Sequence, residues 1–180
     1  MHAYISINGE RLMAEDYAQS VRQAAGYFNR YYRYPVERLA ADYQDEIRKY
    51  SDDRWEAPQR AARLSAAVKN YKTSQMLIFI FDIGIEKGMD LTPLAVKRLC
   101  NSLFGRTESQ SIIVDVFGQR GRSHRSSDST IKVIDEVASK YRYSAGIYWS
   151  ATLKDIEQVK REYRKNVRRD NQHNEKAEDK

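Results

Sequence analysis

The sequence has very few of the residues that build disulfide-linked, metal-binding and catalytic sites. Among its 180 residues is one cysteine, Cys100, which can form neither an intramolecular disulfide nor a cysteine-rich zinc site. The only histidines are His2, His124 and His173, and none has a partner at the spacing of a zinc site or a catalytic triad. The sequence also lacks a Walker-type phosphate loop and a GxGxxG motif. We therefore expect a protein that is not an enzyme and that uses no metal ion or cofactor.

The acidic residues leave one enzymatic alternative open. Asp42, Asp45 and Glu46 fall on the polar side of an expected helix. A solvated surface explains them better than an acid–base pair does, because catalytic carboxylates need burial to shift their pKa values. A metal-dependent nuclease built from more widely scattered aspartates and glutamates remains as the enzymatic alternative.

Long hydrophobic runs are also missing. The most apolar stretch, 76–85, has about half the length needed to cross a bilayer and contains Asp82. The N-terminal residues do not show the charged start, apolar stretch and small-residue cleavage site of a signal peptide. These observations predict a cytoplasmic protein with no membrane partner.

Charge and helical periodicity are what the sequence has in abundance. Charged residues make up 31% of the chain, and the formal net charge of +6 favours an anionic partner. Apolar residues recur at three- and four-residue steps, which predicts a mainly α protein, a bundle of about six helices. We expect these helices at about 17–34, 36–50, 58–85, 93–104, 129–141 and 152–169.

The expected β structure is small. Asn8-Gly9 is a strong two-residue turn signal between the short segments 4–7 and 10–12, which predicts an N-terminal hairpin. One central strand is expected at 111–117, which is rich in β-branched residues. The chain then forms a single helical domain over 1–169, with a possible soft division near 105–128, and a charged flexible tail at 170–180.

Two segments allow alternative interpretations. Pro35 ends the first helix, so that two antiparallel helices follow, or it kinks one long helix. Segment 134–151 matches a helix-turn-helix weakly, because Arg142 occupies the turn position that usually holds glycine and Gly146 weakens the recognition helix. The alternative for this segment is a strand at 141–149, in which aromatic and apolar residues alternate.

Two cationic segments are candidates for binding phosphate. No acidic residue interrupts the polar connection 118–127, whose arginines can make bidentate contacts with phosphate. The last helix is basic over much of its circumference and could lie along a phosphate backbone. A basic surface loop and a solvated final helix explain the same residues without a ligand. The candidate nucleic-acid-binding residues are Arg120, Arg122, Arg125, Lys160, Arg161, Arg164, Lys165 and Arg168.

Tyrosine and arginine also alternate along 27–34, at the end of the first expected helix. We expect Phe28 and Tyr31 to belong to the core, and Tyr27, Arg30 and Tyr34 to be exposed as candidates for an interface. Such rings can stack on unpaired bases, and tyrosine and arginine are equally enriched in protein interfaces.

We therefore expect a non-enzymatic nucleic-acid-binding protein. The alternative is a protein-interaction or regulatory module, such as an inhibitor or an assembly factor, that uses the tyrosine-rich N-terminal helices. Self-association through the same rings is a third possibility.

Overall fold

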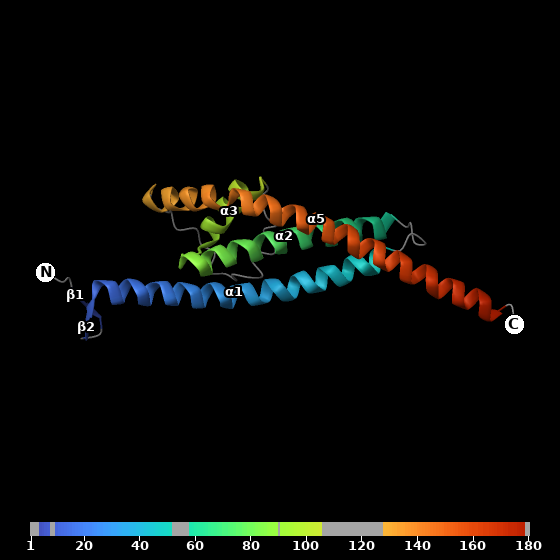
Figure 1. The fold of residues 1–180 in the computed structure, drawn as a ribbon, viewed down its shortest axis with the longest axis horizontal. Helices are drawn as coiled ribbons and strands as arrows, with labels where there is room; N and C mark the ends of the chain where they lie inside the picture. The colour runs from blue at the N-terminus through green and yellow to red at the C-terminus, as the bar shows by residue number, and fades with distance from the viewer. Residues whose placement is uncertain (1–3, 8–9, 52–57, 90, 106–127, 179–180) are drawn as a thin grey trace.

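The structure, a computed structural model, describes residues 4–7, 10–51, 58–89, 91–105 and 128–178. Within these ranges the chain is mainly α, as the sequence predicts. Two long helices lie side by side, a third crosses them, and its C-terminal part extends beyond the others (Figure 1). The elements are β1 (Tyr4–Ile7), β2 (Glu10–Met13), α1 (Ala14–Tyr50), α2 (Pro58–Lys87), α3 (Pro93–Phe104) and α5 (Asp128–Glu178).

The prediction of about six helices is wrong, because the described part of the chain contains four, and α1 and α5 each cover two of the predicted helices. The predicted β element is not confirmed as a whole. Strands β1 and β2 pair antiparallel, with Tyr4 opposite Met13 and Ile7 opposite Glu10. Two predicted features lie entirely outside the described residues: the turn at 8–9 and the central strand at 111–117. The soft division predicted near 105–128 lies outside them except at its two end residues.

Helix α1 continues through Pro35, so the prediction that a helix ends there is wrong. Proline in a helix interior removes one backbone hydrogen bond and usually costs about 3 kcal/mol. The next residue, Val36, is completely buried, as is Ile47 further along. Because α1 packs along α2 on both sides of Pro35, tertiary burial outweighs the local cost.

Helix α2 is the central helix, and the prediction of a helix over 76–85 is confirmed. Its apolar residues are buried nearly all round, which is typical of a helix with neighbours on several sides. Leu77, Ile80 and Phe81 are completely buried and meet Leu99 of α3 and Ile134 of α5 in one core cluster.

Helix α3 begins and ends at the predicted residues. Thr92 caps its N-terminus, because its side-chain oxygen accepts a hydrogen bond from the Ala95 N–H at 3.2 Å, and Pro93 follows at the first position. Gly105 ends it in the left-handed conformation, at φ 62°, and its N–H donates to the Asn101 carbonyl.

Helix α5 is continuous from Asp128 to Glu178, so a helix-turn-helix or a strand within 134–151 is wrong. The predicted start of the last helix near Thr152 is also wrong. Ala138, Ala145, Thr152 and Val159 are all buried and recur every seven residues, so the buried side of the helix passes through the ambiguous segment. Residues 170–178 of the predicted tail belong to α5.

An ion pair joins α3 to α5. Arg98 donates to both carboxylate oxygens of Asp135, at 2.8 and 2.9 Å. These hydrogen bonds, more than the attraction between the charges, hold the pKa of the Asp135 carboxyl below its usual value.

Across the part of the chain that the structure describes, no helix is long and apolar enough to cross a membrane.

Candidate functional site

An exposed row of aromatic side chains follows one side of α1. This ring face consists of Tyr27, Phe28, Tyr31 and Tyr34, which are 78%, 54%, 71% and 62% exposed. The expectation that Phe28 and Tyr31 belong to the core is wrong, whereas Tyr27, Tyr34 and the neighbouring Arg30 are exposed as expected. The ring face is therefore larger than the sequence indicated.

A polar residue takes the buried position that the sequence interpretation gave to the rings. Asn29 is 2% exposed and shares the buried side of α1 with Val36, Ala40 and Ile47, at helical spacing. Its side-chain NH2 donates to the Met89 carbonyl at 2.7 Å, which ties α1 to the connection after α2. Sequence reasoning missed Asn29 because an asparagine in this series does not look like a core residue. The spacing alone could have indicated it.

A groove of about 980 Å3 lies beside the ring face, between α1 and the end of α2. Tyr27 and Arg30 line it, together with Arg22 and Lys87, so cations outnumber the single carboxylate of Glu86. The three cations of the lining can pair with an anionic group, because arginine and lysine bind carboxylate and phosphate. The full lining is Gln19, Arg22, Gln23, Gly26, Tyr27, Arg30, Ile85, Glu86, Lys87 and Gly88.

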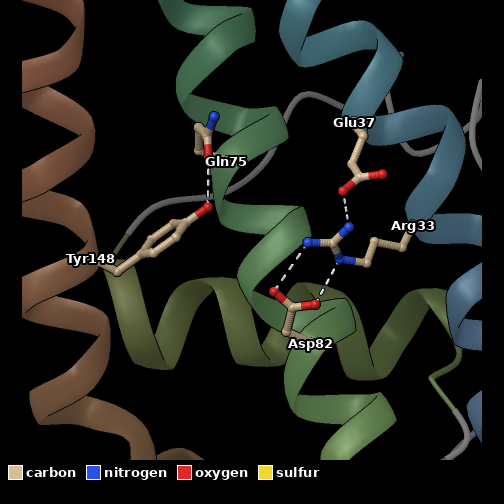
Figure 2. A network of polar contacts seen from close by, with 5 residues as sticks. All are labelled: Arg33, Glu37, Gln75, Asp82 and Tyr148. Atoms are coloured by element: carbon tan, nitrogen blue, oxygen red, sulfur yellow. Dashed lines mark hydrogen bonds and ion pairs between the residues drawn. The ribbon is translucent and has the colours of Figure 1, made fainter.

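The polar groups between the helices form a structural network (Figure 2). Arg33 of α1 bonds Asp82 of α2, from Nε at 2.6 Å and from Nη2 at 3.5 Å, and also pairs with Glu37. Tyr148 of α5 donates its hydroxyl hydrogen to Oε1 of Gln75 of α2 at 2.5 Å. Burial, reinforced by the Asp82 carboxylate and opposed by Arg33, raises the pKa of Tyr148 to about 12. A tyrosine held neutral in this way orders helices and is a poor general base.

A second polar contact joins three helices around Asp155 of α5. Its carboxylate accepts hydrogen bonds from the Tyr71 hydroxyl of α2 and, at 3.4 Å, from the side-chain NH2 of Gln44 of α1. Burial and, after it, the hydrogen bond to Asp155 raise the pKa of Tyr71.

In the described ranges no three histidine, cysteine, aspartate or glutamate residues lie where they could hold a metal ion.

The basic C-terminal part of α5 is the other candidate. Val159 is its last buried side chain among those described; Arg161, Glu162 and residues 172–177 are exposed. Lys160 forms an ion pair with Glu157 of the same helix, with 3.7 Å between Nζ of Lys160 and Oε1 of Glu157. The backbone of Arg164, Lys165 and Arg168 belongs to the same helix, whereas Arg120, Arg122 and Arg125 lie outside the described residues.

Comparison with protein-family models, with curated proteins and with solved structures gives no match for this sequence.

Proposed function

We propose that the protein binds nucleic acid without catalysing a reaction, and that the basic segment 160–169 of α5 contacts the phosphates. The observation that carries this proposal is the continuation of α5 as one helix past Val159, its last described buried side chain. Figure 1 shows this part of α5 extending beyond the other helices. A projecting basic helix has the shape that major-groove and backbone binding require.

The charge of the segment supports the same function. Six cations stand against Glu162 alone, and their positions follow the pattern i, i+1, i+4, i+5, i+8 and i+9. This spacing covers about half of a helix circumference. A row of phosphates can therefore meet cations over three helical turns. The six are Lys160, Arg161, Arg164, Lys165, Arg168 and Arg169.

The arginine-rich connection is proposed as a separate contact. The connection enters α5 at Asp128, and Lys160 follows 32 residues later. That separation is about 48 Å along a straight helix, at about 1.5 Å per residue. Arg120, Arg122 and Arg125 should therefore add to binding independently of the basic segment.

The test is fluorescence anisotropy with labelled single- and double-stranded DNA and RNA at two salt concentrations. Replacing Arg161, Arg164, Lys165 and Arg168 by glutamine should reduce affinity and lower the slope of log affinity against log salt by roughly 3–4. The matched control removes the same number of charges elsewhere on the helix, with glutamine at the exposed Lys132, Lys140, Arg142 and Lys154, and should leave binding nearly unchanged. Unchanged binding in the first variant would refute the role of the basic segment.

Alanine at Arg120, Arg122 and Arg125 provides a third variant for the same assay. A reduced salt slope supports the contact made by the arginine-rich connection. Retained binding with the original slope rejects that contact and leaves the basic segment as the only cationic site proposed. A cytoplasmic location is part of the proposal, because the sequence holds one cysteine, Cys100, and so depends on no intramolecular disulfide.

A second candidate function is protein interaction through the ring face of α1. It is favoured by the exposure of four large aromatic side chains within eight residues, since exposed apolar patches of this kind mark interaction sites. Tyrosine and arginine, both present here, are enriched among the residues that dominate binding energy in protein interfaces.

A further inference from the structure

We propose that the ring face of α1 binds a second copy of this chain, with the two α1 helices antiparallel. The proposal rests on the second candidate function, protein interaction, and names its partner. It starts from the position of α1, which forms one edge of the molecule (Figure 1). The buried side of this helix, with Val36, Ala40 and Ile47, faces α2, and the ring face lies on the opposite side.

The outer side of α1 has the spacing of a coiled-coil seam. Its exposed residues recur at alternating steps of three and four, which is the pattern that packs one helix against another. Tyr31 is also held in place, since its ring packs edge-on against Tyr32, which in turn stacks on the buried Phe81. The seam residues are Ala24, Tyr27, Tyr31, Tyr34, Arg38 and Ala41.

This seam is complementary to itself in one antiparallel register. When facing seam residues have numbers that add up to 65, Tyr31 meets the partner's Tyr34, and Tyr27 meets the partner's Arg38. The first pair is an aromatic contact and the second a cation–π contact, and two-fold symmetry makes each of them twice. Ala24 and the partner's Ala41 then let the helices approach closely at both ends of the seam.

The residues that flank the seam agree with this register. In antiparallel pairs each flank meets the same flank of the partner, so Arg30 faces the partner's Glu37, and Phe28 faces the partner's Pro35. Arg30 and Glu37 are both exposed, and their charges are opposite. A parallel pair in register is disfavoured, because Arg38 would face the partner's Arg38.

The length of the contact agrees with the length of α1, and its area agrees with that of a weak specific interface. The two-fold axis falls between Tyr32 and Arg33, and the middle of α1 is at residue 32, so the two helices overlap along their whole length. A fully buried aromatic side chain removes about 150–250 Å2 from water. Because the four rings of each chain are only 54–78% exposed to begin with, the eight rings contribute roughly 1,000 Å2. That area is near the lower limit of about 1,000 Å2 for a specific interface, which predicts a reversible dimer.

Sedimentation velocity on the full chain tests the proposal over a roughly hundred-fold range of concentration. The wild type should change from monomer to dimer, and Tyr31→Ala with Tyr34→Ala should remain monomeric. The control changes Tyr143→Ala and Ile147→Ala, two exposed residues of α5, and should dimerise like the wild type. Circular dichroism checks that each variant is folded. A wild type that stays monomeric throughout, or dimers in the ring-face variant, would overturn the proposal.

Cross-linking tests the register. Chains with Ala24→Cys, mixed with chains with Ala41→Cys, should form a disulfide-linked pair under mild oxidation, because these positions face each other. Chains with Ala24→Cys mixed with chains with Lys49→Cys should not, since Lys49 lies two turns further along α1. Equal cross-linking in both mixtures would refute this register.

The nucleic-acid-binding proposal and the dimer proposal can be refuted independently of each other. Nucleic-acid binding is read by anisotropy on variants of α5, whereas the dimer is read by sedimentation on variants of α1. If the wild type is monomeric and the ring-face variant loses a different, identified protein partner, the second candidate function stands and the self-association is rejected.

Discussion

Replacing Gly84 by alanine should destabilise the protein, although alanine favours helices. Gly84 is buried in α2 where that helix meets α1 and Leu91. A Cβ at this position would lie 2.5 Å from Cδ1 of Leu91, 2.9 Å from its Cγ and 2.7 Å from Nδ2 of Asn29. All three distances are shorter than Cβ atoms adopt, so both neighbours would have to move.

Neither neighbour can move freely. Leu91 is 5% exposed and belongs to the core cluster, and the Nδ2 atom of Asn29 is fixed by its hydrogen bond to Met89. Overpacking a core costs about 1–3 kcal/mol, and a buried amide that loses its partner costs about 1–3 kcal/mol. Alanine returns about 1 kcal/mol through its helix propensity. The free energy of unfolding should therefore fall by roughly 1–5 kcal/mol.

Two other glycines provide matched controls. Gly26 in α1 and Gly146 in α5 are also inside helices, but a Cβ on either would have no atom within 4 Å. Alanine at each should raise the free energy of unfolding by up to about 1 kcal/mol. Urea denaturation followed by circular dichroism measures all three variants. If Gly84→Ala is as stable as these controls, the close approach of α1 and α2 at Asn29 is wrong.

Two further predictions concern pH and capping. Burial raises the pKa of Tyr148 to about 12 from the ordinary value of 10.0, so its neutral form is favoured in the folded state. Stability from this residue is complete below pH 10.0 and is lost as pH rises towards about 12. Denaturation across that range should show the decline, and Tyr148→Phe should make it shallower; an unchanged slope would contradict the burial. Thr92→Ala removes the cap of α3 and should lower the free energy of unfolding by about 1 kcal/mol. No loss in denaturant titration would contradict the cap, and Thr92→Ser, which keeps the hydroxyl, should be close to the wild type.

The parts of the fold that the sequence predicted are those with local signals. Thr92, Pro93 and Gly105 define the ends of α3 through their own side chains and backbone angles. The apolar run 76–85 falls within the helix predicted at 58–85, and in the structure its side chains are buried nearly all round, as in a central helix. Each of these signals lies within a few residues of the feature it specifies.

The wrong predictions concern long helices, where tertiary contacts outweigh local preferences. Pro35 is a local signal to end a helix, but Val36 and Ile47 gain burial only if α1 continues. In α5 the alternation around Tyr143 and Ile147 resembled a strand, whereas both side chains are exposed on the outside of a helix. Ala145, which lies between them in the sequence, is completely buried. Because alanine is small and only weakly hydrophobic, the sequence alone does not indicate that it belongs to the core.

The candidate site was predicted in part for the same reason. Exposure of Tyr27, Arg30 and Tyr34 follows from helical spacing, and the structure agrees. Sequence reasoning places the core on Phe28 and Tyr31, because large rings are usually buried. Asn29 is buried instead, since a partner from a distant part of the chain, the Met89 carbonyl, satisfies its amide. No local pattern indicates a contact across 60 residues.

The polar contacts between helices explain which surfaces remain available. The Arg33–Asp82, Tyr148–Gln75 and Tyr71–Asp155 pairs connect α1, α2 and α5 across 49 to 84 residues. Directional pairs of this kind fix how long helices slide and rotate against one another, which apolar packing alone specifies less strictly. With that rotation fixed, the ring face of α1 must point outwards. The basic segment of α5 follows the last described buried residue of that helix, Val159. Because the two surfaces are on different helices and share no residue, a substitution in one tests its own function without removing the other.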